Sequence, residues 1–172
     1  MNYLISKAHA FATGAHGAIG QKRKYTGEDY IVHPRRVAET IIRIGGSGEM
    51  IAAAYLHDVV EDTQVSGSII KEEFGTVVYE LVMGLTDVSK PGDGNRKLRK
   101  SMDAVHTASA SREVQIIKLA DLIDNTTDIV RYDPWFAKVY LEEKATMLTV
   151  MDKVHDHELF TLAQSNWPEG YD

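Results

Sequence analysis

The sequence predicts an all-α protein, a single helical domain spanning residues 1–172, and three observations support this. Apolar residues recur at helical spacing along nearly the whole chain. No stretch alternates polar and apolar residues convincingly over the length of a strand. The segment MIAAAYL at 50–56 is apolar nearly all round, as is typical of a central, buried helix.

In the N-terminal half, glycine and proline mark where the helices begin and end. Thr26-Gly27 indicates a turn within an irregular segment over 20–32. Pro34 suits the first turn of a helix, because its missing N–H has no helical partner at that position, and Gly45-Gly46 ends the same helix. The expected helices run from about Tyr3 to about Ala18, from Pro34 to the glycine pair, from Met50 to about Glu61, and as a short pair over 66–74 and 75–85.

In the C-terminal half, the clearest loop is SKPGDGN at 89–95, which contains one proline and two glycines. Helices are expected after it at about 96–108, 113–130, 134–152 and 156–164. The absence of repeats, low-complexity tracts and linkers favours one compact domain.

Composition excludes several classes of protein. With 172 residues, 44% apolar and 26% charged, the chain can bury a core without disulfides. It has no cysteine, which excludes disulfide scaffolds, thiolate zinc sites and cysteine nucleophiles. No apolar run reaches the ~20 residues of a membrane span and the start has no secretory pattern, so we expect a soluble cytoplasmic protein without a membrane partner.

Charge is unevenly distributed along the chain. The net charge of −6 disfavours a broad nucleic-acid surface, so no nucleic-acid partner is expected. Residues 21–36 and 90–100 nevertheless each hold more Lys and Arg than Asp and Glu. Such islands are usually solvated surface, but they also suit a small polyanion bound at one cleft.

The most informative stretch is YLHDVVEDT at 55–63. If the preceding helix continues through it, His57 and Glu61 are neighbours one turn apart, and so are Asp58 and Asp62. Four ionisable groups at the end of a core element are costly to bury unless they are paired or coordinated. The mixed imidazole and carboxylate set suits Mn, Fe, Co or Zn better than Ca. A fraying helix end is the simpler reading of an HD dipeptide alone.

Two further stretches carry polar residues at notable positions. On the helix over 113–130, Asp121, Asp124, Asn125 and Asp128 form a polar stripe, which for Asp124 and Asp128 is equally well a solvent face. Asp121 follows the apolar run IIKLA, which favours a position next to the core. In YIVHPRRVAETI, His33 precedes Pro34 at a helix start, where a lone histidine is usually a turn or capping residue.

Taken together, these segments resemble the HD phosphohydrolase superfamily, whose pattern is H…HD…D. The match is closest to the alarmone (ppGpp) hydrolase branch, which includes the hydrolase domain of RelA/SpoT enzymes and small stand-alone alarmone hydrolases. The resemblance covers roughly residues 8–130 and rests on four segments in family order: RKYTGEDYIVHPRRVA (23–38), AAAYLHDVVEDT (52–63), FGTVVYELVMGLTDVSK (74–90) and IIKLADLIDNT (116–126).

The resemblance implies an all-helical bundle and a set of site residues. One divalent metal ion is implied, usually manganese, with Glu61 and Asp62 as an acidic pair beside the water that the metal activates. Arg23 and Lys24 match the basic pair near the nucleotide base and phosphates, and Asn125 matches an asparagine of the nucleoside pocket. The implied metal ligands are His33, His57, Asp58 and Asp121.

The sequence departs from the family pattern at three places. Asp29 stands where GEPYI has proline, and the approach to Arg23 is a residue or two longer. Leu122 and Asp124 replace the arginine and histidine of the common ADRLHN, which changes the pocket beside the metal. The first hypothesis is therefore a 3′-pyrophosphohydrolase of guanosine alarmones. The alternatives are a phosphohydrolase of another phosphorylated nucleoside and an inactive alarmone-binding module.

Overall fold

A computed structural model describes residues 2–165, which are helical apart from turns, loops and one isolated β-bridge between Lys22 and Asp29. The all-α prediction is confirmed. In the described part of the chain, no helix is long and apolar enough to cross a membrane. The helices are α1 (Tyr3–Ala18), α2 (Val32–Arg43), α3 (Gly48–Leu56), α4 (Val59–Asp62), α5 (Gly67–Leu85), α6 (Arg96–Ser109), α7 (Arg112–Tyr132), α8 (Pro134–Val150), the 3-10 turn η1 (Asp152–Val154) and α9 (Glu158–Ser165).

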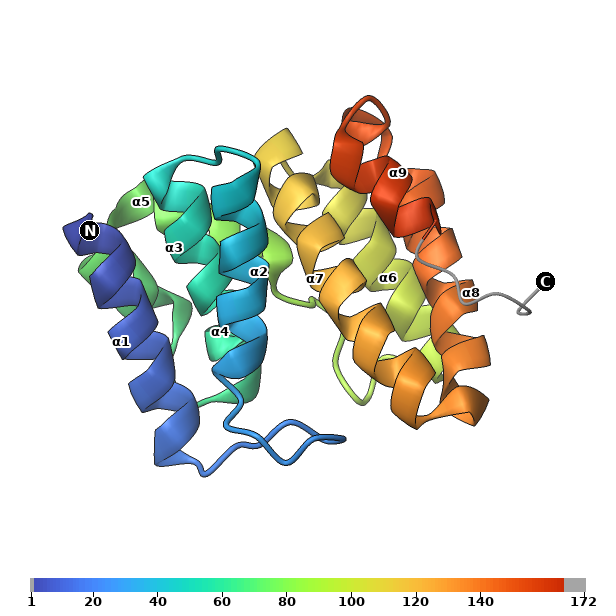
Figure 1. The fold of residues 1–172 in the computed structure, drawn as a ribbon, viewed down its shortest axis with the longest axis horizontal. Coiled ribbons are helices and arrows are strands. Elements are labelled where there is room, and N and C mark those ends of the chain that lie inside the picture. The colour runs from blue at the N-terminus through green and yellow to red at the C-terminus, as the bar shows by residue number, and fades with distance from the viewer. Residues whose placement is uncertain (1, 166–172) are drawn as a thin grey trace. The chain divides into compact units, whose positions relative to one another are not determined.

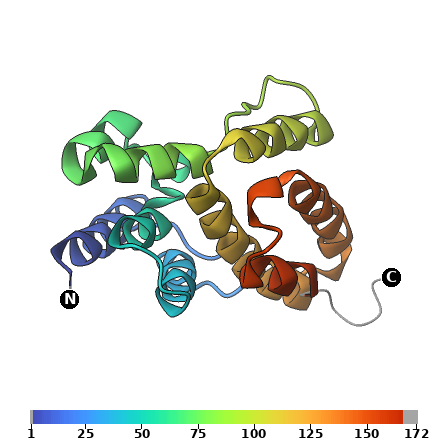
Figure 2. The ribbon, with the colours of Figure 1, turned by 90° about the horizontal axis from the view of Figure 1, so that it is seen from above.

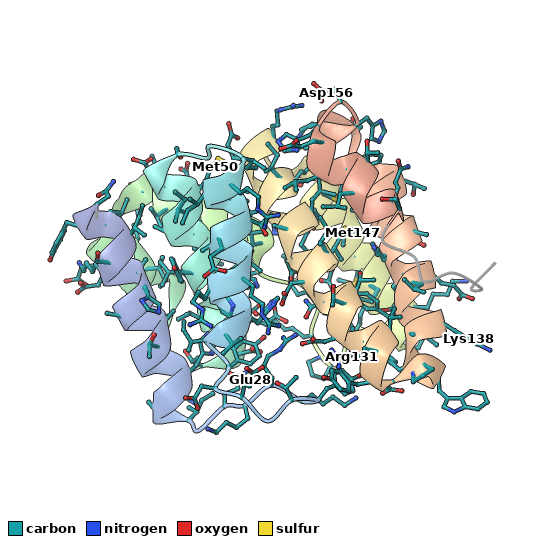
Figure 3. All side chains as sticks on the ribbon, in the orientation of Figure 1. Glu28, Met50, Arg131, Lys138, Met147 and Asp156 are labelled. Atoms are coloured by element: carbon teal, nitrogen blue, oxygen red, sulfur yellow. The ribbon has the colours of Figure 1, made fainter. Side chains whose placement is uncertain are left out.

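Polar side chains cap the N-termini of several of these helices. At α3, the Ser47 hydroxyl accepts a hydrogen bond from the Met50 N–H at 3.2 Å, and Met50 is labelled near this end in Figure 3. Capping satisfies a backbone donor that has no partner within the helix. The side chains of Asn2, Asn95, Ser111 and Asp133 cap α1, α6, α7 and α8 in the same way.

The predicted third helix is corrected by the structure. The expected continuous helix from Met50 to Glu61 ends at Leu56, and a separate turn of helix, α4, begins after Asp58. Asp58 has φ −96° and ψ −4°, which turns the chain between the two helices. Sequence periodicity did not show this break, because no glycine or proline marks it.

The short helical pair predicted over 66–85 is present as one kinked element, α5. Gly75, with φ +83° and ψ 172°, has non-helical backbone at the predicted junction. A side chain is strained at this φ, so glycine suits the kink. The helices before and after it both bury apolar residues, among them Ile70, Phe74, Val78 and Val82.

The contacts of the chain group into two compact units, residues 1–86 and 87–172. The expectation of one domain over 1–172 stays a prediction. In the first unit, α3 is the central element, with α1, α2 and α5 packed on it (Figure 1), and its residues from Met50 to Leu56 are all buried. This confirms the central position that its composition predicted.

In the second unit, α7 is the central helix. It packs against α8, α9 and η1, and α6 also packs against α8 (Figure 2). The buried Asp103 carboxylate of α6 accepts hydrogen bonds from the N–H groups of Val88 and Ser89 and from the Ser89 hydroxyl. Burial opposes ionisation of Asp103, but these bonds and the Lys100 charge outweigh it and lower its pKa. The 89–95 loop is thereby anchored to α6 at its start.

Candidate metal centre

Three of the predicted ligands meet in the first unit. His33 comes from the first turn of α2, His57 follows the last residue of α3, and Asp58 precedes α4. Each offers one donor atom, and these atoms lie within 4.8 Å of one another. Both imidazoles are buried, while the Asp58 side chain is 20% exposed. Helix breaks at His57 and Asp58 therefore give the cluster one open side.

The hydrogen bonds of His57 decide which ring nitrogen is available. Its Nδ1 lies 2.8 Å from the carbonyl oxygen of Ala54, which can only accept, so Nδ1 carries the proton. In the neutral ring, Nε2 then holds a lone pair, 3.1 Å from Asp58 Oδ2. His33 Nε2 lies 3.7 Å from the same oxygen. A lone pair facing a carboxylate oxygen is repulsive unless a cation or a proton lies between them, and a buried pair of imidazoles beside a carboxylate is a donor set that fits a divalent metal.

Tyr30 orients the carboxylate of this cluster. Its hydroxyl donates to Asp58 Oδ2 at 2.7 Å, and its ring centroid lies 4.7 Å from that of His16 and 6.0 Å from that of His33. Groups that hold metal ligands from behind commonly fix ligand orientation. The sequence analysis did not identify Tyr30, because the function of a tyrosine in an irregular segment depends on where that segment folds.

The predicted acidic pair lies on α4, and both side chains are exposed. The Asp62 N–H donates to the Asp58 carbonyl at 2.9 Å, so these two residues are one turn apart as expected. His57 and Glu61 are not joined by a continuous helix, which corrects that pairing. Desolvation and the Asp58 charge raise the pKa of the Asp62 carboxyl, against lowering by hydrogen bonds from Gln21 and Tyr30.

The segment between α1 and α2 carries the predicted basic pair. The Arg23 N–H donates to the Glu28 carbonyl at 2.8 Å, and Glu28 is labelled on this loop in Figure 3. The Arg23 guanidinium lies 5.9 Å from the centroid of the Tyr30 ring. Lys24 is exposed, with its Nζ 3.2 Å from the Tyr25 hydroxyl. Arg23 thus lies on the same tyrosine that holds Asp58.

Asp121 and Asn125 lie in the second unit, on α7. Asp121 is buried, as predicted from its position after an apolar run. Its Oδ2 lies 2.9 Å from Lys118 Nζ, and its Oδ1 accepts from the Asn125 amide at 2.6 Å. Asp128 is also buried, so the solvent-face reading is wrong for that residue. Asp121 is thereby an oriented carboxylate, and its role as a ligand stays a prediction.

In the second basic island, 90–100, some of the cationic side chains form ion pairs. Arg96 binds Glu143 through two nitrogens, at 2.6 and 2.8 Å. Lys100 Nζ lies 2.8 Å from Asp87 and 3.8 Å from Asp103. These pairs join α6 to α8 and to the preceding loop, so structure accounts for at least two of the island's cations.

Comparison with known proteins identifies a family. A profile described as "HD domain" matches residues 8–134. A guanosine-3′,5′-bis(diphosphate) 3′-pyrophosphohydrolase from Aquifex aeolicus is 37% identical over 140 residues, covering 81% of this chain and 18% of that protein. A GTP pyrophosphokinase from Streptomyces coelicolor is 35% identical over 122 residues, covering 70% of this chain and 14% of that protein. The chain thus spans less than a fifth of these curated relatives.

This chain is also similar to a solved structure from the same group of proteins. The structure of a metazoan ortholog of SpoT, described as hydrolysing ppGpp and acting in starvation responses, matches this chain with a TM-score of 0.79 at 25% identity. The match covers 96% of this chain and 94% of that one. The similarity therefore extends over nearly the full length of both chains compared.

Proposed function

Since this chain belongs to the HD-domain family, we propose that it hydrolyses the 3′-pyrophosphate of guanosine alarmones, converting ppGpp to GDP and pyrophosphate. The observation that carries the proposal is the cluster of His33, His57 and Asp58, with a histidine lone pair directed at a carboxylate oxygen. The names of the relatives from Aquifex and the metazoan support the choice of substrate.

The proposed ligand set is His33, His57, Asp58 and Asp121, and the proposed ion is Mn²⁺. Neutral imidazoles and carboxylates suit a first-row divalent metal. Bound there, such an ion supplies a Lewis acid that polarises a phosphate oxygen and makes water a better nucleophile at neutral pH. Tyr30, through its bond to Asp58 Oδ2, would hold one ligand in place. The cytoplasm as the compartment belongs to the same proposal.

Glu61 and Asp62 would orient the attacking water and accept its proton on a carboxylate oxygen. The water oxygen forms a bond to the phosphorus nearest the ribose, and the bond from that phosphorus to the 3′ oxygen breaks. Pyrophosphate leaves intact, and the 3′ oxygen takes a proton to become a hydroxyl. General acid–base catalysis of this kind contributes roughly 10²–10⁴-fold.

Arg23, Lys24 and Asn125 would bind the nucleotide, the small-molecule partner that we propose. A planar guanidinium can stack on a base, whereas an ammonium acts as a point charge for phosphate. Arg23 lies over the Tyr30 ring, which restricts the guanidinium and is consistent with a flat contact surface. Asn125 is joined to Asp121 by a hydrogen bond, which suits a residue close to a ligand carboxylate.

A second candidate is the hydrolysis of another phosphorylated nucleoside. ADLIDN favours it, because Leu122 is buried and apolar where the related pattern has arginine, and Asp124 brings a negative charge where it has histidine. These changes would remove positive charge from a phosphate-binding pocket. Under this hypothesis the ligands and acidic pair keep their roles while the preferred nucleotide differs.

Product analysis tests the proposal. Purified protein is incubated with ppGpp and Mn²⁺, with nucleoside monophosphates and triphosphates assayed in parallel. GDP and pyrophosphate in equal amounts are expected. Orthophosphate released from ppGpp, or faster turnover of an ordinary nucleotide, would replace this function with the second candidate. Absence of any turnover by metal-loaded protein would instead indicate a binding module.

A further inference from the structure

A chain of three hydrogen-bonded side chains reaches Asp62 from the end of α1. His16 Nδ1 lies 2.7 Å from Gln21 Oε1, and Gln21 Nε2 donates to Asp62 Oδ2 at 2.8 Å. We propose that Gln21 and His16 are positioning residues that hold the Asp62 carboxylate in its working orientation. The inference rests on the proposed function for the role of Asp62.

The donors and acceptors along this chain can be arranged in one direction only. An ionised carboxylate accepts, so the amide NH₂ of Gln21 faces Asp62 and its oxygen faces His16. His16 must then donate through Nδ1–H. The His16 ring is 1% exposed, and its Nε2 has no hydrogen-bond partner among residues 2–165. A hydrogen on Nε2 would have no acceptor, so the geometry favours Nδ1 as the nitrogen of His16 that carries the donated hydrogen.

The backbone at the end of α1 sets the first of these contacts. The Gln21 N–H donates to the His16 carbonyl at 3.1 Å, and the Gly20 N–H donates to that of Gly17 at 3.0 Å. This pair of bonds is the Schellman motif, which requires a left-handed residue at Gly20, and Gly20 has φ +64°. The motif folds the chain back so that Gln21 lies against the residue that orients its amide.

The second contact restricts an otherwise mobile group. Asp62 is an exposed residue at the end of α4, a helix of only four residues. Fixing Oδ2 on Gln21 limits rotation of the carboxylate about its side-chain bonds. Because a shift of about 1 Å in a reacting group can cost roughly 10²-fold in rate, this restriction matters for turnover more than for binding.

Three substitutions separate positioning from a structural role. Gln21→Met keeps the length of the side chain and removes both bonds. Gln21→Glu still accepts from His16 but cannot donate to Asp62 when ionised. His16→Phe keeps a ring beside Tyr30 without a donor. Lys22→Gln is the matched control, because Lys22 belongs to the same loop and pairs with Asp29 at the exposed surface.

Two readouts are measured, steady-state hydrolysis of ppGpp with Mn²⁺ and the ¹H–¹⁵N spectrum of the histidine rings. Both Gln21 variants should lower kcat roughly 10- to 100-fold, with KM and bound metal within about twofold of wild type. The double variant His16→Phe with Gln21→Met should be no slower than Gln21→Met alone, because His16 acts through Gln21. Lys22→Gln should turn over at the wild-type rate. His16 should show a hydrogen-bonded Nδ1–H in wild type and in Gln21→Glu, and the ¹H shift of that hydrogen bond should be lost in Gln21→Met, which removes the acceptor.

Three outcomes would overturn the inference. If Gln21→Glu turns over at the wild-type rate while Gln21→Met is slow, Gln21 serves only to link the loop to His16. Wild-type kcat in both Gln21 variants would contradict positioning altogether. An Nε2–H tautomer of His16 in the wild-type spectrum would exclude the direction of the hydrogen bonds. The spectrum does not depend on turnover. An inactive wild-type protein would therefore overturn the proposed function, while the spectrum would still show whether His16 donates to Gln21 through Nδ1–H.

Discussion

At the scale of single residues, the candidate site depends on which atoms of an imidazole are protonated. The Nδ1–H of His57 donates a hydrogen bond to a backbone carbonyl, and the Nδ1–H of His16 donates one to the Gln21 side-chain oxygen. In the first case the exposed lone pair faces Asp58, and in the second it faces the interior. Two histidines with the same tautomer thus serve different purposes, because their Nε2 atoms have different neighbours.

The acidic pair should contribute to turnover and not to binding. Glu61→Gln and Asp62→Asn keep shape and remove the proton acceptor, so we expect kcat to fall by roughly 10²-fold or more while metal affinity and KM for ppGpp stay near wild type. Arg23→Ala is the contrasting variant, and it should mainly raise KM. A wild-type kcat in either acid variant would remove that residue from the proton transfer.

Lys144 should make the protein more stable as the pH rises. It is 1% exposed, its Nζ has no hydrogen-bond partner in the described part of the chain, and burial lowers its pKa to about 8. The pKa of a lysine in an unfolded chain is about 10.4. Between pH 8 and this value the unfolded state binds more protons than the folded state, so the free energy of unfolding increases with pH. Below pH 8 Lys144 is charged in the folded state, and the full cost of burying that charge lowers the free energy of unfolding.

Replacing this lysine tests the penalty directly. Lys144→Met should raise the free energy of unfolding at pH 7 by up to about 3 kcal/mol and abolish its rise between pH 8 and 10. Urea unfolding at four pH values measures both. Lys138→Met on the exposed side of α8 is the control and should change stability by less than about 0.5 kcal/mol. An unchanged pH profile in Lys144→Met would contradict the assignment.

At the scale of elements, helix ends build the site. The break between α3 and α4 delivers His57 and Asp58, and the end of α1 delivers Gln21. In each case a helix stops where its last residues can turn a polar side chain toward the cluster. His33, in the first turn of α2, completes the cluster from inside a helix, so both helix ends and a helix start supply its side chains.

Gly20→Ala tests the importance of the α1 terminus. No atom lies within 4 Å of a Cβ at this position, so the cost comes from φ +64° alone and should be about 1–2 kcal/mol of stability. Gly14→Ala, inside the same helix and also without close neighbours, should instead stabilise by about 0.5–1 kcal/mol. Thermal unfolding of both variants gives the comparison, and equal midpoints would refute the role of Gly20.

At the scale of the whole molecule, a bound metal should stabilise the folded state. With free Mn²⁺ at 100 times its Kd, linkage predicts about 2.7 kcal/mol of added stability, and acid should weaken binding because the imidazoles must be neutral. His57→Ala and Asp121→Asn should each lose most of this gain. Asp124→Asn, on the same helix as Asp121, is the control for metal affinity. Full activity after exhaustive chelation would refute metal dependence.

The sequence by itself determined the helical class and most helix boundaries. It also indicated which histidine and acidic residues are candidates for the site. The helical spacing of apolar residues and the positions of glycine and proline are local signals. They predicted α1, the break at Gly75 and the central, buried α3. The family pattern named His33, His57 and Asp58 before any geometry was known. In the structure the donor atoms of these three residues lie within 4.8 Å of one another, and their role as metal ligands stays a prediction.

Only the tertiary structure decided how α3 ends and which side chains support the ligands. The break at His57 and Asp58 appears only in the folded chain, because neither glycine nor proline marks it in the sequence. Tyr30, Gln21 and His16 act on Asp58 and Asp62 across separations of up to 46 residues, and no local pattern encodes such contacts. Hydrogen-bond direction depends on which donor meets which acceptor, and folding alone brings them together.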